Sequence, residues 1–269
     1  MALLLGSIPS PSSGFLDLGP LHLHLYGLIL VVAIGAAALL GGRRWVATGD
    51  VTWELVLRVT VWGVVWGVVG ARLYHVITSW DQLPDAWWGV FALWKGGLGI
   101  WGAIAGGVLG GAVVARRAGA NVALGMDCAA PGLVLAQAIG RLGNWMNQEL
   151  FGGPTSLPWG LEIDPAHRPA GYEQDATFHP TFLYELLWNL LVCAVLLWVG
   201  RRFRMRPPAL FFLYVALYTF GRFWFELLRI DPAHHILGVR VNVFVAAVVF
   251  AAASALVVRF QRAPRSVQR

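Results

Sequence analysis

The sequence predicts an all-α fold, a polytopic integral membrane bundle of seven transmembrane helices with its N-terminus outside and its C-terminus in the cytoplasm. Three observations predict it. The 269 residues are 58% apolar and only 13% charged, and the mean hydropathy is +0.64. Seven apolar stretches each approach the roughly 20 residues that a helix needs to cross a bilayer. Basic residues collect in alternate loops, which sets an orientation.

The seven expected spans follow one another along almost the whole chain. Hydropathy windows place them near residues 22–42, 54–78, 97–116, 122–140, 180–200, 208–228 and 240–260. Because no internal repeat or low-complexity tract stands out, we expect a single domain covering residues 1–269. Residues 1–20 have no basic start, so we expect no cleaved signal peptide.

Arginines mark one side of the expected bundle. They follow the first, third, fifth and seventh spans: Arg43, Arg44, Arg116, Arg117, Arg201, Arg202, Arg204, Arg206, Arg259, Arg262, Arg265 and Arg269. The intervening loops are larger or richer in acids, so the positive-inside rule puts the arginines in the cytoplasm. We attribute the formal net charge of +6 to this edge and to attraction for anionic lipids of the bilayer. No basic patch on a folded surface is visible, and we expect no nucleic-acid partner.

A polar run, GRLGNWMNQELFG, follows the fourth expected span. It contains Arg141, Asn144, Asn147 and Glu149. Charged groups are costly to hold beside hydrocarbon, so they need either a partner or a substrate whose own charge compensates them. This run is the first candidate for a functional site, on the outer side.

The sixth expected span carries a polar stripe. Tyr218, Arg222, Glu226 and Arg229 recur at spacings of four, four and three, which places them on one helical face. A guanidinium offers a fork of donors that matches phosphate oxygens. Together with Arg141, the two arginines of the stripe indicate a site for a phospholipid headgroup. The structural alternative is a buried ion-pair ladder that only orders the bundle.

Two further runs contain polar groups. His179, in HPTFLYELLWNL, is a candidate for proton transfer or headgroup contact. Glu185 and Asn189 in the same run lie four residues apart, and for them we favour a structural network inside the bundle. Tyr26 and His24, in the early run HLYG, are candidates for lipid contact or for anchoring at the membrane interface.

The sequence contains little that would hold a metal or support redox chemistry. Cys128 and Cys193 both fall inside apolar stretches, which supports neither a disulfide framework nor a thiolate site. His234 and His235 are adjacent and lack other nearby ligands. We therefore expect no metal and no cofactor.

The four polar runs GRLGNWMNQELFG, HPTFLYELLWNL, YTFGRFWFELLR and HLYG resemble those of bacterial prolipoprotein diacylglyceryl transferases, and the similarity extends from about residue 22 to 260. The resemblance implies a seven-span catalytic domain in the bacterial inner membrane. Such an enzyme transfers the diacylglyceryl group of phosphatidylglycerol to the thiol of a lipobox cysteine in a prolipoprotein signal peptide. Glycerol phosphate is released.

The resemblance and the chemistry together assign roles. Negative charge develops on the departing phosphate, so nearby cations should lower the barrier. Positive charge also favours the thiolate form of the attacking cysteine. We expect Arg141, Arg222 and His179 to be catalytic, with His24 as the alternative to His179 for the base. The expected substrate-binding residues are Arg141, Asn144, Asn147, Glu149, Tyr26, Tyr218, Arg222, Glu226 and Arg229.

Two other classes of protein remain as alternatives. A transporter for anionic metabolites or lipids would also gather arginines in a bundle, but such proteins usually show paired inverted repeats, which are not visible here. An intramembrane serine protease needs a serine nucleophile with a partner. Ser254 lies well inside an expected span, but nothing around it resembles a nucleophile elbow.

The chain departs from the family at one position. Many members have a histidine followed by two glycines in the third span, and this histidine has been proposed to act in catalysis. Here Trp101 occupies that position, in GGLGIWGA. Tryptophan cannot accept a proton, so either the histidine is not a universal base or another group serves here. We favour the first interpretation, because the arginines and the polar runs are intact.

Replacing Trp101 with phenylalanine tests this interpretation. Trp101→Phe should retain substantial diacylglyceryl transfer, since an aromatic ring without a titratable group already occupies the position. Transfer to a lipobox peptide, normalised to the amount of inserted protein, measures the effect. Complete loss at normal expression would assign Trp101 a specific role.

Overall fold

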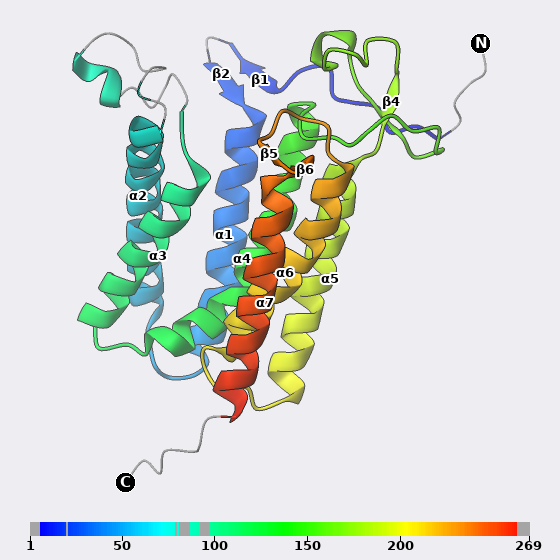
Figure 1. The fold of residues 1–269 in the computed structure, drawn as a ribbon. Coiled ribbons are helices and arrows are strands. Elements are labelled where there is room, and N and C mark those ends of the chain that lie inside the picture. The colour runs from blue at the N-terminus through cyan, green and yellow to red at the C-terminus, as the bar shows by residue number, and fades with distance from the viewer. Residues whose placement is uncertain (1–5, 20, 79, 81–86, 92–96, 263–269) are drawn as a thin grey trace. The chain divides into compact units, whose positions relative to one another are not determined.

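The computed structural model describes residues 6–19, 21–78, 80, 87–91 and 97–262. Seven α-helices occur in this part of the chain (Figure 1). They are α1 Leu25–Val46, α2 Trp53–Thr78, α3 Ile100–Arg117, α4 Val122–Met146, α5 Thr181–Arg202, α6 Ala209–Leu228 and α7 Val241–Arg262. The connections include the short 3-10 helices η2 (Trp87–Phe91) and η4 (Pro165–His167).

Six of these helices are long and apolar enough to cross a membrane, namely all but α3. The protein is therefore a polytopic membrane bundle of helices. Helix α3 has 18 residues and ends with Arg116 and Arg117, so both charges fall within its length. Each expected span overlaps one α-helix. The largest extension is in α4, which continues six residues beyond the expected end at residue 140, into the polar run.

The chain divides into two compact units. The first comprises Met1–Gly41 and Met126–Arg269, and the second comprises Gly42–Gly125. The first unit contains α5, α6, α7 and most of α1 and α4. The second contains α2 and α3.

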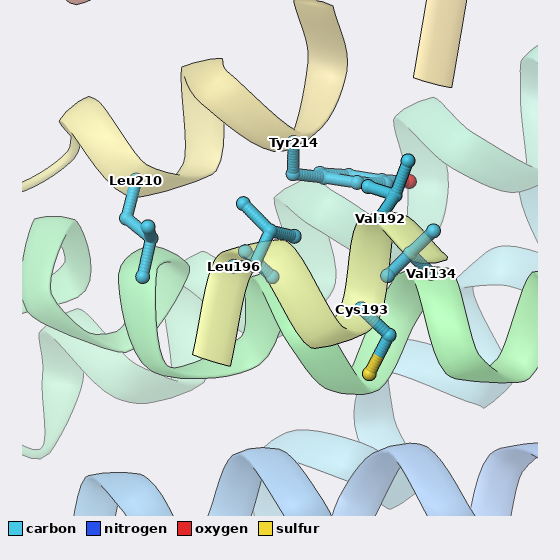
Figure 2. Close-up of a cluster of buried hydrophobic side chains, with 7 residues drawn as sticks. Val134, Val192, Cys193, Leu196, Leu210 and Tyr214 are labelled. Atoms are coloured by element: carbon cyan, nitrogen blue, oxygen red, sulfur yellow. The ribbon is translucent and has the colours of Figure 1, made fainter. Parts of the chain in front are cut away.

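The core of the first unit lies where α4, α5 and α6 meet (Figure 2). Val134, Val192, Leu196, Leu210 and Tyr214 are buried there against one another. An apolar core gains little from water exclusion inside a bilayer, so close packing supplies the stability. This packing fixes the rotation of the three helices, and with it the direction of the polar groups farther along them.

The described residues of the first unit form three short antiparallel ladders outside the helices. They pair β1 (Phe15–Leu18) with β2 (Leu21–His24), β3 (Leu161–Glu162) with β4 (Thr177–Phe178), and β5 (His235–Ile236) with β6 (Val239–Arg240). Figure 1 shows the labelled strands of all three gathered at one end of the helices. Hydropathy windows do not predict such short strands, because each has at most four residues.

The long loop between α4 and α5 folds around its own small core. Phe151, Leu161, Ile163, Phe178 and Phe182 are buried together. The N-terminal segment lies against this loop, because Ile8 pairs in parallel with Leu161 and the Trp145 indole donates to the Pro9 carbonyl at 3.1 Å. The loop that follows the polar run is thus a packed element.

The second unit depends on the close approach of α2 and α3. Gly70, Gly102 and Gly106 bring the two backbones into contact, and a Cβ at Gly106 would overlap the Trp66 carbonyl. Arg72 on α2 donates to the Gly89, Val90 and Gly97 carbonyls. Small residues that allow backbones to touch are the common means of packing helices in membranes.

A pair of alanine substitutions on α3 measures this contact. Gly106→Ala should lower the melting temperature of the detergent-solubilised protein by several degrees, because overpacking costs about 1–3 kcal/mol. The matched change Gly111→Ala meets its nearest atom, Val59 Cγ1, at an ordinary 3.5 Å. It should leave the melting temperature equal or slightly higher, since alanine favours helix. Equal effects at both positions would contradict this packing.

Candidate functional site

Arg141 lies on α4, in the extension beyond the expected span. Its Nη2 is 2.6 Å from a carboxylate oxygen of Glu185, and its Nη1 donates to Asn144 Oδ1 at 3.0 Å. The Tyr218 hydroxyl is a further hydrogen-bond partner. These contacts explain why α4 continues through a polar run, because each polar group there finds a partner within the bundle.

The chain reverses directly after α4. Gln148 and Leu150 adopt positive φ values of 51° and 60°, and the Glu149 amide donates to the Asn144 carbonyl at 3.0 Å. The reversal directs the Glu149 carboxylate back toward the helix, where it accepts from Asn144 at 2.9 Å and Asn147 at 3.3 Å. Glu149 therefore fixes the orientation of the two side-chain amides. Asn144 in turn holds the Arg141 guanidinium through its side-chain oxygen.

Glu185 joins the polar run to the sixth helix. It is only 3% exposed, and its second carboxylate oxygen lies 3.6 Å from Arg222 Nη1. The sequence interpretation gave Glu185 a structural network only. The signal available in the sequence was a carboxylate in an otherwise apolar helix, which requires a cation nearby, although spacing alone does not identify which one.

The charged side chains of the polar stripe, Arg222, Glu226 and Arg229, all take part in ion pairs. Glu226 is fully buried and forms an ion pair with Arg222, while Arg229 Nη1 lies 3.9 Å away. Its other oxygen accepts from Arg240 Nε at 2.7 Å and from Asn242 Nδ2 at 3.1 Å. Sequence reasoning missed Arg240, because it belongs to a loop that folds back on α6.

Arg240 also organises the loop between α6 and α7. Its Nη1 donates to the Asp231 carbonyl at 2.6 Å and its Nη2 lies 3.0 Å from the Asp231 carboxylate, which also accepts from Arg229 Nε at 2.6 Å. Burial opposes ionisation of Asp231, but these two arginines outweigh it and lower the pKa of its carboxyl. Burial would likewise lower the Arg240 pKa, and its bonds to Glu226 and Asp231 raise it instead. Both groups therefore stay charged at neutral pH.

The two tyrosines predicted to contact substrate lie beside Arg141. The Tyr218 side chain forms a hydrogen bond with Arg141, and it lies one helical turn before Arg222 on α6. Tyr26, at the start of α1, lies over Gly143, where any Cβ would overlap its ring. It is near enough to interact electrostatically with both Glu149 and Arg141. The structure thus brings these predicted residues into one group.

His179 belongs to a different group. Its Nδ1 is 3.3 Å from the Tyr184 hydroxyl, which accepts from the Trp159 indole at 3.1 Å. Its backbone pairs with Gly152 and Gly153, at 2.9 Å in each direction. Gly152 also bridges to Arg229, so the backbone connects this group to the end of the arginine stripe.

Comparisons with known proteins identify the family of this chain. The family model of prolipoprotein diacylglyceryl transferase matches residues 13–259. The chain belongs to this family.

Three relatives show how far the similarity to other prolipoprotein diacylglyceryl transferases extends. The phosphatidylglycerol-prolipoprotein diacylglyceryl transferase of Cutibacterium acnes is 54% identical over 260 residues, covering 95% of this chain and 87% of the relative. The enzyme of that name from Frankia alni is 53% identical over 254 residues, covering 92% and 66%. The second such transferase of Streptomyces coelicolor is 52% identical over 268 residues, covering 97% and 83%.

The backbone of Gly152 contacts both His179 and Arg229, and a substitution can test whether this crossing needs a glycine. A Cβ there would meet His179 Cβ at 2.8 Å and the Leu228 carbonyl at 3.0 Å. Gly152→Ala should therefore cost about 1–3 kcal/mol of stability through overpacking, measured as a lower melting temperature. Gly153→Ala, whose nearest atom is Ile230 Cγ2 at 3.9 Å, is the matched control and should change little. Similar losses at both glycines would show that the crossing tolerates a methyl group.

Proposed function

We propose that this chain transfers the diacylglyceryl group of phosphatidylglycerol to the thiol of the lipobox cysteine in prolipoprotein signal peptides. The product is a thioether, and glycerol phosphate is released. The observation that carries this proposal is the meeting of Arg141 and Arg222, from two different helices, at the Glu185 carboxylate. We call these two the phosphate arginines. Family membership favours this transferase activity over the alternative of an anion or lipid transporter.

The reaction needs cations where the phosphate departs. The cysteine thiolate attacks the glycerol carbon that bears the phosphate ester, the carbon–oxygen bond breaks, and its electron pair stays on the phosphate oxygen. The phosphate arginines hold this group and stabilise the charge that develops on it. Such fixed cations are worth most in a site from which water is largely excluded.

The remaining residues of the group position the lipid and the arginines. Tyr26 and Tyr218 contact the lipid beside Arg141. Asn144 and Asn147 bind the glycerol headgroup or hold the loop, and their bonds to Glu149 support the second role. The carboxylates Glu149 and Glu226 and the cation Arg229 orient the phosphate arginines.

His179 is the proposed proton acceptor for the thiol. The Tyr184 hydroxyl fixes the orientation of its ring. Imidazole is the side chain whose ordinary pKa lies nearest neutrality, as a general base requires. The backbone crossing at Gly152, which contacts both His179 and Arg229, supports a position of His179 at the edge of the arginine group.

The topology that suits this function has seven spans, with α3 as the third. The N-terminus then lies outside and the C-terminus in the cytoplasm, within the bacterial inner membrane. The ends of α4 and α6 and the start of α5 face outward, where secreted precursors arrive. The whole chain, residues 1–269, acts as one catalytic domain that needs no cofactor and binds no nucleic acid.

The central test is replacement of Arg141. Arg141→Ala should reduce transfer about 100- to 1,000-fold, the typical loss when one donor to a developing anion is removed. Arg141→Lys should also be severely impaired, because an ammonium cannot contact Glu185, Asn144 and phosphate with one planar fork. Mass spectrometry of a lipobox peptide incubated with phosphatidylglycerol detects the added diacylglyceryl mass on cysteine.

The control is Arg58→Ala, which removes an exposed arginine of α2. It should transfer normally. Full activity of Arg141→Ala would refute the site assignment, and a wild-type protein that adds no mass would refute the transferase proposal itself.

A further inference from the structure

Glu185 is the carboxylate that touches both phosphate arginines. One of its oxygens lies 2.6 Å from Arg141 and the other lies 3.6 Å from Arg222. With 3% of its surface exposed, little water screens these contacts. Glu185 therefore occupies part of the donor surface that a bound phosphate would use.

Further ion pairs connect to the phosphate arginines. Glu226 contacts Arg222 and Arg240, and Asp231 contacts Arg229 and Arg240. Glu149 reaches the group only through the side-chain amide of Asn144. Across the ion pairs that are directly connected, four arginines face the three carboxylates Glu185, Glu226 and Asp231, which leaves one net positive charge.

That single charge suits the substrate better than the product. Phosphatidylglycerol is a phosphodiester with one negative charge. Once the thiolate has attacked, its charge and that of the diester both reside on glycerol phosphate. A phosphate monoester carries about −1.5 to −2 charges at pH 7, so the site that fits the lipid is one positive charge short for the released product.

From this balance we propose that Glu185 competes with glycerol phosphate for the two guanidiniums and so promotes product release. This inference rests on the proposed function, because it places the phosphate at these arginines. Glu185 acts through Arg141 and Arg222, which makes it a positioning residue. Two arginines without this carboxylate would retain the product and slow each turnover.

The variant Glu185→Gln keeps the size of the side chain and removes its charge. Inhibition by glycerol phosphate should become about tenfold stronger, since a like charge facing the product is removed. Inhibition by glycerophosphoglycerol, a diester with one charge, should strengthen only about threefold, because repulsion scales with charge. Both kcat and KM should fall. A purely structural role would weaken inhibition and raise KM.

Two controls separate charge from geometry. Glu185→Asp keeps the charge on a shorter side chain, and its inhibition constant for glycerol phosphate should stay within about twofold of wild type. Glu173→Gln removes a fully exposed carboxylate on the outer loop and should change neither constant. If Glu185→Gln does not yield folded protein, Glu185→Asp still decides, because a tenfold gain in inhibition there would overturn the proposal.

Failure of this inference is distinct from failure of the proposed function. Unchanged or weaker inhibition of Glu185→Gln by glycerol phosphate, or equal gains for monoester and diester, would overturn the role of Glu185 while transfer by the wild type continues. Loss of transfer by the wild type would instead remove the proposed function on which the inference rests.

Discussion

The contact between Arg141, Glu185 and Arg222 is the interaction on which the polar end of the first unit depends. Three helices converge there, and each supplies one charged side chain to the contact. Removing one member of a buried pair leaves an uncompensated charge, which costs about 3–5 kcal/mol. The apolar core between α4, α5 and α6 determines the rotation of the helices, and the three charges then hold that rotation at the polar end of the unit.

A second charge group extends this arrangement. Glu226 accepts hydrogen bonds from Arg240 and Asn242 at the junction with α7. Side chains of α4, α5, α6 and α7 therefore belong to one polar network. The loops contribute through backbone geometry. The reversal at Gln148 and Leu150 turns Glu149 toward Asn144, and the crossing at Gly152 joins the His179 group to Arg229. In the proposed site, the helices supply the charged side chains and the loops fix their positions.

Much of this could be predicted from the sequence. Apolar length predicts where the helices lie, and the cost of charge beside lipid marks Arg141, Arg222 and Glu226 as functional candidates. Pairing is less predictable, because it depends on how far each helix rotates about its axis. Glu185 was missed as a member of the site for that reason, and Arg240 was missed because it lies in a loop that folds back on α6. The ladders were missed because two- to four-residue strands leave no periodic signal.

The loop from Asp231 to Arg240 has a consequence for how the protein is made. One oxygen of the Glu226 carboxylate is paired with Arg240, the residue that immediately precedes the last helix. During synthesis, α6 emerges from the ribosome with this carboxylate before Arg240 exists. The network can close only after the chain has been extended into α7. The segment that leads into the final helix thus completes the polar network, and a nascent chain that stops before it contains Arg141, Glu185, Arg222 and Glu226 without the contacts of Arg240 and Asn242.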